Sequence, residues 1–550
     1  MSKMSKAVNE MREEAILRRD EVVTNFMGGD SYKINPLDTL KMITASSIFG
    51  EPSYYRGSKS RTSYVVDALV KEFSVIPKIY EGKDTETIME EAIDAALDYD
   101  FGATLEWATT LRNDYMMRLN PQVIMVRAAT HPKRQEWTNA NPGEFDKYNQ
   151  LVMKRADEPM SQMAYYLYKN KGKKNNIPSV IKRSWAKNLS GLSRYKVAKY
   201  KNHEIGMING VRLCHANSKV IDELMTTGTV EVNNDQKTWE NLRSEGKSWK
   251  EIFETIDMGH MALLRNLRGV FEEVEDTAFC KKYLEKLKSG VLDGKQFPFR
   301  YHSAIKAVEG SYKCHHKPLI VDALEECMDI ALDNFPKLKG KTMCLSDNSG
   351  SAWGAINSEY GSVTIAEIDN LSSVITAACS DEGYVGKFGD KLIVSPISKR
   401  RGVLSQTKEI TSNRNGDVGG ATEGGIWEFF RDAIANKEHW DNIFIYSDQQ
   451  AGHGGLYGTS RHKTEYNSRG YGCGRGWGSM DHINVFKLVQ EYRKKVNPKV
   501  NVFSIQTAGY NNAVIPEYAY RTNIMYGWTG KEAVFAKSMI DQWDTLDSKN

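Results

Sequence analysis

The stretch Cys344–Gly354, CLSDNSGSAWG, decides the fold that we expect for the second part of this 550-residue chain. An apolar run, TMCL, leads almost directly into Asp347, Ser349 and Ser351, which occupy alternate positions. An apolar run followed by small polar residues and glycine is typical of a buried strand that ends in a tight turn. The spacing therefore predicts a strand whose carboxyl end carries one carboxylate and two hydroxyls.

The chain after residue 340 alternates between strand-like and helix-like runs. KLIVSPIS, NIFIYSD, NVFSIQT and NIMYGW have the composition of short strands, and EGGIWEFFRDAIANK and INVFKLVQEYRKKV have helical spacing. This alternation predicts an α/β domain with a parallel, doubly wound sheet. The functional crevice of such a sheet lies at the carboxyl ends of its strands, where the Asp-Ser-Ser turn is expected.

Two other loops supply oxygens to the same expected edge. Thr422 lies in the glycine-rich GGATEGG, and Asp448 ends the strand NIFIYS. Carboxylates and hydroxyls are hard ligands that suit Mg²⁺. These residues resemble the metal-ion-dependent adhesion site of von Willebrand factor type A domains, which implies a divalent cation, Mg²⁺ or another, with a position open for a partner's acidic group. The implied metal ligands are Asp347, Ser349, Ser351, Thr422 and Asp448. Alternatively, the serines only cap the next helix and Asp448 closes a turn.

No catalytic residue is expected. Nothing near Ser349 matches the G-x-S-x-G elbow of serine hydrolases, and GGATEGG lacks the G-K-[ST] ending of a phosphate-binding loop. The cluster Cys314–His316 (CHH) has no second cluster with which to hold zinc. We therefore expect a binding protein and not an enzyme.

The first 335 residues have a helical pattern. Apolar residues recur at spacings of three and four in EEAIDAALDYDFGATLEWATTLRNDYMMRL, in HMALLRNLRGVFEEVEDTAFCKKYLEKL and in KPLIVDALEECMDIALDNF. Many helices joined by short polar turns predict a repeat-like helical array in which each pair buries its apolar face against the next. The chain is also too long for one hydrophobic core, so two or three domains are expected.

Composition and cysteine usage indicate a cytoplasmic protein. The N-terminal stretch MSKMSKAVNEMREEAILRRD is charged and lacks the apolar core of a secretory signal, and no run approaches the roughly 20 apolar residues of a membrane span. The seven cysteines are scattered without a C-x-x-C pair, which favours reduced thiols.

Positive charge is concentrated in the first part of the chain. Residues 341–550 contain 23 basic and 23 acidic side chains, so the net charge of +4 arises before residue 341. The stretch Tyr168–Lys201, which we name the basic tract, holds eleven Lys or Arg without one Asp or Glu, and Trp185, Tyr195 and Tyr200 lie among them. A solvated helix usually mixes both signs, so the tract predicts a surface for a polyanion such as RNA. The alternative is an exposed helical face.

Four ordered segments carry a second resemblance. NFMGGDSYKINPLDTLKMITASSIFGEPSYYR (Asn25–Arg56) has an N-x-x-G-G start and a G-x-x-x-Y-Y end, and VAKYKNHEIGMINGVRLCHA matches much of T-K-Y-x-x-R-x-G-W-S-H-x-D-L-L-R-L-x-H. MALLRNLRGV (Met261–Val270) and FPFRYHSAI (Phe297–Ile305) continue the match. These segments resemble the TROVE domain of the Ro autoantigen family. With the type A domain, the resemblance extends from about position 20 to about position 535.

The resemblance implies a ring of HEAT-like helical repeats whose ends are bridged by the type A domain. It also implies a monomer that holds small noncoding, Y-like RNA on its outer surface and single-stranded 3′ ends of misfolded RNA in its central hole. Its role would be RNA quality control, or a scaffold for an exoribonuclease such as polynucleotide phosphorylase. A single strand passes a hole that excludes a duplex. The alternative is a protein-interaction scaffold in which the cation recruits an acidic partner.

The expected RNA-binding residues come from the basic tract and the matched segments. They are Lys182, Arg183, Lys187, Lys199, Lys201, Arg212, His215, Arg265 and Arg268. The chain departs from the family where the W-S-H turn reads Ile205-Gly206-Met207, so a histidine that the family uses to contact Y RNA is missing. Other interpretations are that Arg212 and His215 satisfy helix ends and that Arg265 is a buried structural arginine.

The predicted boundaries are an N-terminal arm at 1–20, a TROVE helical domain at 21–338 and the type A domain at 339–550. The type A domain contains a glycine-rich insertion at 449–480, where nine glycines occur among tyrosines and arginines. An insertion of this length is either functional or disordered, and its aromatic and arginine side chains suit stacking on single-stranded RNA.

Overall fold

The structure is a computed structural model of the chain. It describes residues 22–24, 30–33, 35–46, 85–114, 117–174, 176–200, 205–231, 237–296, 298–354, 364–412, 417–420, 423–448, 484–507, 512–515, 519–526 and 532–549. Contacts divide these residues into two compact units. The helical unit contains the described residues between 35 and 248, and the sheet unit contains 22–33 and those from 249 onward. No helix in these ranges is long and apolar enough to cross a membrane.

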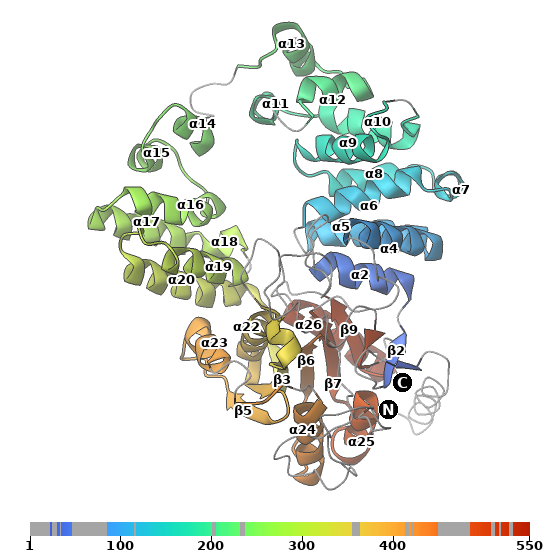
Figure 1. Cartoon of the computed structure of the whole chain (residues 1–550), viewed down its shortest axis with the longest axis vertical. Helices are drawn as coiled ribbons and strands as arrows, with labels where there is room; N and C mark the ends of the chain where they lie inside the picture. The colour runs from blue at the N-terminus through green and yellow to red at the C-terminus, as the bar shows by residue number, and fades with distance from the viewer. Residues whose placement is uncertain are drawn as a thin grey trace, which may run out of the picture. The chain divides into compact units, whose positions relative to one another are not determined.

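The helical unit is built from short helices that pack in pairs, as the sequence predicts. They are α2 (Pro36–Ser46), α4 (Thr85–Tyr99), α5 (Phe101–Asn113), α6 (Leu119–Thr130), α7 (Arg134–Ala140), α8 (Glu144–Val152), α9 (Glu158–Lys169), α10 (Ser179–Ser190), α11 (Arg194–Tyr200), α12 (Met207–Cys214), α13 (Lys219–Thr227) and α14 (Trp239–Ser244). Helix α5 packs on α6 and α8, α6 on α9, and α10 on α8 and α12 (Figure 1). Local capping sets their starts: the Asp100 side chain accepts a hydrogen bond from the Ala103 amide at the first turn of α5.

A buried polar network fixes α10 within this unit. Gln162 on α9 donates to Gln122 on α6 at 2.7 Å and to Asn149 on α8 at 2.8 Å. The indole of Trp185 on α10 donates to the Gln162 carbonyl at 2.7 Å, and Asn149 donates to the Ser184 hydroxyl at 3.0 Å. Buried amides must be paired to avoid a desolvation penalty, so this network holds the inner face of α10 in one register.

The sheet unit begins with a second group of helices. They are α15 (Trp249–Thr255), α16 (His260–Glu273), α17 (Thr277–Ser289), α18 (Val291–Gly294), α19 (Pro298–Glu309) and α20 (Lys317–Ala331), followed by the 3-10 turn η3 (Leu332–Asn334). His260, at the start of α16, joins three of them: its Nδ1 lies 3.0 Å from the Leu287 carbonyl oxygen and its Nε2 lies 2.8 Å from the Tyr301 hydroxyl. These helices contact the sheet layer through pairs such as α20 and α23 (Val403–Thr411), so they belong to the sheet unit.

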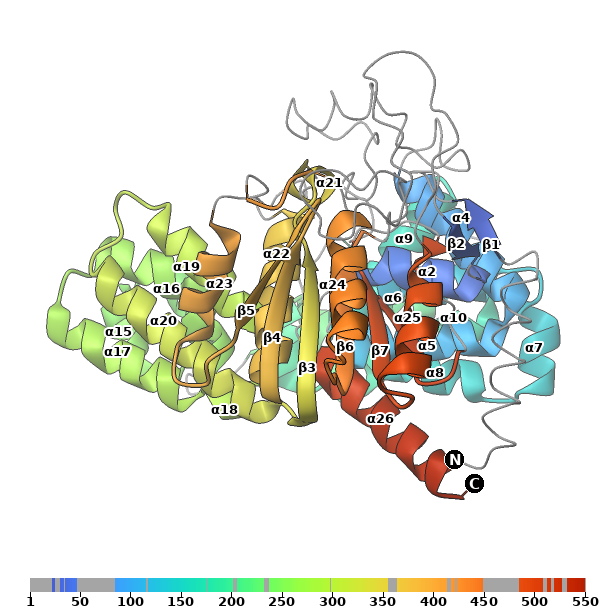
Figure 2. The same ribbon diagram turned by 90° about the horizontal axis from the view of Figure 1, so that it is seen from below.

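The main sheet has six strands in the order β5-β4-β3-β6-β7-β9. The strands are β3 (Leu338–Asp347), β4 (Ser380–Phe388), β5 (Leu392–Pro396), β6 (Asn442–Ser447), β7 (Asn501–Gln506) and β9 (Thr522–Tyr526). Helices α24 (Glu423–Ala435) and α25 (Val485–Lys495) cover one face, which is toward the viewer in Figure 2, and α22 (Ile365–Ala378) and α26 (Glu532–Lys549) cover the other. β3 and β6 are completely or largely buried, as expected for strands with helices on both faces.

The sheet differs from the predicted, fully parallel one at a single edge. β5 runs antiparallel to β4, while the other strand pairs are parallel. Neither β4 (SDEGYVGKF) nor α23 was predicted. β4 has few β-branched residues and contains two glycines, so it lacks the composition of a strand. Gly383 is required by packing: a Cβ there would lie 2.0 Å from the carbonyl oxygen of Ala377, at the end of α22. Helix packing therefore selects glycine in a strand where propensity disfavours it.

A small second sheet joins distant parts of the chain. Its order is β1 (Val22–Thr24), β2 (Asp30–Lys33) and β8 (Asn512–Ala513), and all pairs are antiparallel. Tyr32 pairs with Ala513 in the backbone register. The first described strands therefore belong to the sheet unit, and among the described residues this unit resumes at Trp249.

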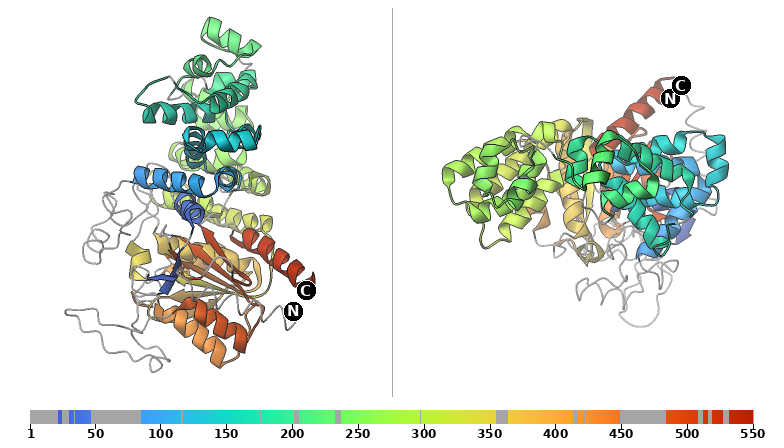
Figure 3. Two further views of the ribbon diagram at one scale, coloured as in Figure 1. Left: turned by 90° about the vertical axis from the view of Figure 1, so that its right-hand side faces the viewer. Right: turned by 90° about the horizontal axis from the view of Figure 1, so that it is seen from above.

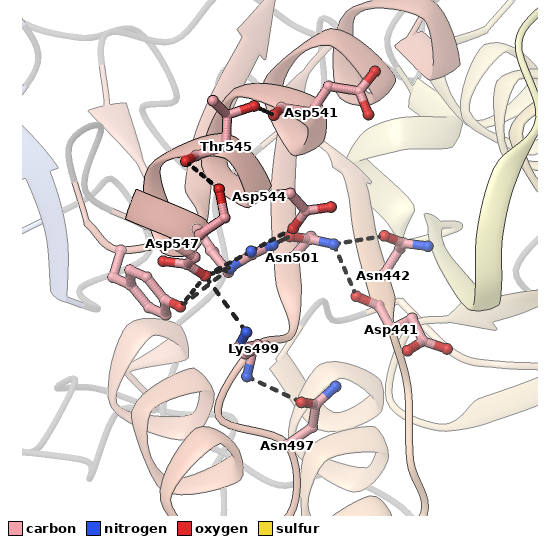
Figure 4. Close-up of polar contacts among 12 residues, drawn as sticks. Asp441, Asn442, Asn497, Lys499, Asn501, Asp541, Asp544, Thr545 and Asp547 are labelled. Atoms are coloured by element: carbon pink, nitrogen blue, oxygen red, sulfur yellow. Dashed lines mark hydrogen bonds and ion pairs between the residues drawn. The ribbon is translucent and has the colours of Figure 1, made fainter. Parts of the chain in front are cut away.

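The last described helix, α26, contacts the main sheet at the amino-terminal ends of its parallel strands and extends from the sheet in Figure 3. Arg521, just before β9, is 4% exposed at its side chain and contacts Asp544 and Asp547 of α26. It also donates to the Asn501 side chain at 2.9 Å, and Asn501 donates to Asn442 at 2.9 Å (Figure 4). The guanidinium therefore ties α26 to the amino-terminal ends of β6 and β7.

The predicted domain boundary at 338/339 stays a prediction. The main sheet begins at Leu338, but contacts divide the chain near residue 248. The arm at 1–20 and the insertion at 449–480 lie outside the described residues, as does most of Asn25–Arg56. The six cysteines among the described residues are buried and free.

Candidate metal centre and nucleic-acid interface

The Asp-Ser-Ser turn lies at the carboxyl end of β3. Asp347 is the last residue of the strand and is fully buried. Its Oδ1 accepts a hydrogen bond from the Ser349 amide at 2.8 Å, and its Oδ2 accepts one from the Ser447 hydroxyl at 2.6 Å. The short helix α21 (Gly350–Gly354) follows, and its Ser351 hydroxyl lies 2.9 Å from that of Ser349. The turn thus fixes the carboxylate and brings both serine hydroxyls together.

Asp448 joins this group because β6 lies beside β3 in parallel. It directly follows β6 and is fully buried, and its Oδ2 accepts a hydrogen bond from the Ser351 hydroxyl at 2.7 Å. The chain order places β4 on one side of β3 and β6 on the other, so these side chains lie where the winding of the sheet reverses. The structure therefore brings together four of the five predicted ligands.

Thr422, the fifth predicted ligand, lies outside the described residues. Its loop nevertheless contacts the Asp-Ser-Ser turn, because the Gly350 amide donates to the Gly420 carbonyl at 2.8 Å. The residue two positions before Thr422 is therefore already hydrogen-bonded to the first residue of α21.

The electrostatics of this edge favour a bound cation. Burial, and then the charge of Asp448, raise the pKa of Asp347 to about 7. Two buried carboxylates at one strand edge repel each other, and a divalent ion between them would remove that repulsion. The donor set of two carboxylates and two hydroxyls fits Mg²⁺. The described residues contain no group of three or more His, Cys, Asp or Glu that could hold a metal ion.

Sequence reasoning missed the residues of α22 that support the turn. Asn370 accepts hydrogen bonds from Ser346 at 2.7 Å and from Asn348 at 2.8 Å, and it donates to the Asn348 carbonyl at 3.1 Å. Its neighbour Asp369 is fully buried, and its pKa is raised well above the usual range by burial and by the charge of Asp347. No sequence signal identifies these residues, because they belong to a helix that follows the turn in the chain but contacts it only in the folded sheet.

The basic tract forms α10, α11 and the loop before them in the helical unit. Three of its cations pair with carboxylates: Lys169 with Glu90, Lys187 with Asp146, and Arg194 with Glu223. Seven others have no ion pair among the described residues, and Lys201 lies outside them. These seven are Lys171, Lys173, Lys174, Lys182, Arg183, Lys196 and Lys199. The tract therefore has a surplus of unpaired positive charge.

The predicted residues of α11 and α12 are also exposed. The Lys199 ammonium lies 5.7 Å from the ring centre of Tyr200, and the Arg155 guanidinium lies 5.3 Å from the same ring. Arg212 is exposed near the end of α12, and His215 ends that helix with a left-handed φ of 61°. The backbone of His215 closes the helix by donating to Val211, while its imidazole faces solvent.

Arg265 and Arg268 lie on α16 and belong to the sheet unit, whereas the other described residues of the RNA-binding prediction belong to the helical unit. Both are exposed, so the interpretation of Arg265 as a buried structural arginine is wrong. The Arg268 side chain lies 3.6 Å from a carboxylate oxygen of Glu272, one turn along the helix.

The architecture has a counterpart among solved structures. The crystal structure of the Deinococcus radiodurans Ro protein, RSR, matches with a TM-score of 0.55 at 12% sequence identity. The match covers 91% of this chain and 99% of that one. This chain has the Ro fold. No family model and no curated protein matches the sequence.

The Ro fold confirms the predicted combination of a helical array with a C-terminal α/β domain. The predicted resemblance to the Ro family is therefore confirmed for the fold. At 12% identity, the match does not assign a ligand to any residue of this chain. We name the group Asp347, Ser349, Ser351 and Asp448, at the carboxyl ends of β3 and β6, the cation edge. The roles of the cation edge and of the basic tract depend on their own chemistry.

Proposed function

We propose that this protein binds RNA through the basic tract of its helical unit, as a Ro-like, non-catalytic RNA-binding protein. The observation that carries the proposal is the surplus of cations on α10 and α11 and in the loop before them, seven of which have no carboxylate partner in the described part of the chain. Phosphate chains bind such surfaces by releasing counterions, and aromatic side chains such as Tyr195 add stacking area. The Ro fold of the chain supports this function.

Salt dependence of RNA binding tests the proposal. The triple variant K182E/K196E/K199E reverses three unpaired cations of the tract. A matched control, K281E/K313E/K337E, reverses three exposed lysines of the sheet unit that have no ion pair in the described ranges.

Binding of a hairpin RNA with a single-stranded 3′ tail would be measured by fluorescence anisotropy at several salt concentrations. Each lost phosphate contact removes about 0.7–0.9 from the log–log slope, so the tract variant should lower it by about 2 and the control should not. Equal slopes for wild type and tract variant would place the RNA elsewhere.

The finer proposal is a ring with Y-like RNA outside and single-stranded 3′ ends in its hole. The connectivity supports it, because the first and last described segments, 22–33 and 532–549, belong to the sheet unit, and the helical unit lies between them in the chain. A 3′ tail closed by a second stable hairpin should then bind more weakly than an open tail, since a duplex cannot pass the hole. Equal affinity for open and closed tails would count against threading. An exoribonuclease partner would be sought by pull-down with the open-tailed complex.

The cation edge favours a second, compatible function. We propose that Asp347, Ser349, Ser351, Thr422 and Asp448 hold Mg²⁺ and that the cation recruits an acidic group of a partner protein. The four described side chains converge within hydrogen-bonding distance, which supports the proposal. Calorimetric titration of Mg²⁺ into wild type and Asp347→Ala tests it. No heat of binding in the wild type would leave the serines as capping groups only.

A further inference from the structure

A polar cavity of about 700 Å³ lies in the helical unit between α7, α8 and α10. This volume is within the range of about 300–1,000 Å³ that small-molecule and cofactor sites occupy. α10 contributes Ser179, Arg183 and Lys187, which follow one another at intervals of four and so share one face of the helix. The opposite, inner face of α10 carries Trp185 in the buried amide network, so the cavity wall is rigidly placed.

The cavity concentrates guanidinium groups that lack carboxylate partners. Arg134 of α7 and Arg183 of α10 both line it, and neither has an ion pair among the described residues. Four other arginines of the same unit are paired. Arg112 lies 2.8 Å from Glu158, Arg118 lies 2.9 Å from Asp157, Arg127 lies 3.2 Å from Glu90 and Arg155 lies 2.9 Å from Asp157. Arg134 and Arg183, like the exposed Arg212, lack such a partner among the described residues, and they differ from Arg212 in lining this cavity together.

Asp146 is the one acidic residue among the described residues that line the cavity, and it is already neutralised. Its Oδ2 accepts from the Lys187 ammonium at 2.6 Å, and its Oδ1 accepts from the Gln150 amide at 3.1 Å. These contacts outweigh burial, which is the largest single influence, and lower the pKa of Asp146. The remaining charge of the cavity is that of the two arginines, so an anion is the ligand that fits.

The cavity also presents groups that suit a nucleobase. Gln135 and Asn139 of α7 line it, and their side-chain amides have no hydrogen-bond partner among the described residues. An amide carries both a donor and an acceptor and can pair with the edge of an unstacked base. A bare phosphate would contact the arginines only, whereas a nucleotide would contact both the arginines and these exposed amides, so a nucleotide uses more of the lining.

We infer that this cavity binds one nucleotide of an RNA chain, with the phosphate between Arg134 and Arg183 and the base against Gln135 and Asn139. The inference rests on the proposed RNA-binding function and names the site where an unpaired nucleotide is held. RNA is favoured over a free nucleotide because Arg183 and Lys187 belong to the basic tract, which continues from the cavity to α11 and can follow the neighbouring phosphates.

Two variants of different chemistry test the site in the full chain. R134Q/R183Q removes the charge, and S179W fills the cavity from an exposed position without changing charge. K219Q is the control in the helical unit, since Lys219 is exposed, lies outside the basic tract and does not line the cavity, and K281Q/K313Q is the control in the sheet unit. Affinity for a labelled single-stranded uridylate oligonucleotide would be measured by anisotropy, alone and in competition with uridine 5′-monophosphate.

The inference predicts that R134Q/R183Q and S179W each weaken binding about tenfold or more, because a charge-assisted contact or the whole pocket is lost, while both controls stay within about threefold. If the wild type binds RNA and the cavity variants behave like K219Q, the cavity assignment is overturned but the proposed function is left intact. Absence of any RNA binding by the wild type would overturn both. The cavity variants could instead abolish tight binding of the mononucleotide and leave the oligonucleotide affinity unchanged. This result would assign the cavity to a free nucleotide and refute the RNA assignment.

Discussion

Replacing Asp347 by Asn should stabilise the protein when metal is removed and should abolish its response to Mg²⁺. Asp347 is fully buried, and burial together with the charge of Asp448 raises its pKa to about 7 from an ordinary 3.8. The folded-state pKa lies above the unfolded-state value, so ionisation of Asp347 destabilises the fold progressively as the pH rises from about 4 to about 7, and the full penalty applies above that.

The expected magnitude follows from this shift. About three pKa units at about 1.4 kcal/mol each give a penalty of about 4 kcal/mol at pH 8, which Asn cannot incur. Asn offers one carbonyl oxygen where Asp347 accepts from both Ser349 and Ser447, so one hydrogen bond is lost, at about 1 kcal/mol. The net gain is about 3 kcal/mol at pH 8, or about 4 °C in the melting temperature of a unit of this size, and it falls to below about 1 kcal/mol at pH 5.

Scanning calorimetry of wild type and D347N, in EDTA and in Mg²⁺ at both pH values, measures all of these effects. Mg²⁺ should raise the melting temperature of the wild type and leave that of D347N unchanged, because a ligand stabilises only the state that binds it. Ser447→Ala is the matched control, since it removes one hydrogen bond to Asp347 and leaves the charge. A D347N protein that melts below the wild type in EDTA at pH 8 would refute the argument from buried repulsion.

Three further changes probe other parts of the sheet unit. Arg521→Ala should cost about 2–3 kcal/mol and increase hydrogen exchange of α26, because it removes a buried guanidinium and leaves the largely covered Asp547 carboxylate without its partner. Lys537→Ala removes a more exposed i,i+4 pair on the same helix and should cost less than about 0.5 kcal/mol. Gly383→Ala should lower the unfolding free energy by at least about 2 kcal/mol in urea titrations, since its Cβ would overlap the Ala377 carbonyl, and a neutral result would mean that α22 shifts freely. Burial lowers the pKa of His302 to about 4. As the pH falls from 6.5 to 4, this histidine is protonated in the unfolded chain but not in the folded one, so the free energy of unfolding decreases. Over that range His302→Gln should lose about 1–2 kcal/mol less unfolding free energy than wild type, and parallel pH curves would contradict this.

Much of the sheet and the cation edge could be predicted because both depend on local order in the chain. A buried strand followed by D-x-S-x-S is expected to place these residues at the carboxyl edge of a doubly wound sheet. Asp448 directly follows β6, the strand that pairs with β3, and so reaches the same edge. β4 could not be predicted, since Gly383 is selected by contact with α22 and not by strand propensity.

The supports of the site were not predictable either. Asn370 contacts the Asp-Ser-Ser turn only because α22 packs on β3, and nothing in its own neighbourhood marks it. The cavity beside Arg183 depends on α7, which precedes α10 in the chain with two other helices between them. Only the folded structure shows that Arg134 and Arg183 lack carboxylate partners in the described ranges, and this observation is what indicates an anion site. The sequence pattern predicted the basic tract as a whole, but it did not predict that Arg183 and Lys187 of this tract line a cavity.

The pairing of β2 with β8 has a consequence for how the protein is made. Tyr32 leaves the ribosome early, whereas its strand partner, Ala513, is synthesised close to the end of the chain. At a synthesis rate of about 5–20 residues per second, β1 and β2 wait roughly 25–100 seconds for the strand that completes their sheet. During this interval the nascent chain exposes an unpaired strand edge, which is prone to association with other chains. The sheet unit therefore cannot finish folding until β8 and the segment after it have been translated, however early the helices fold.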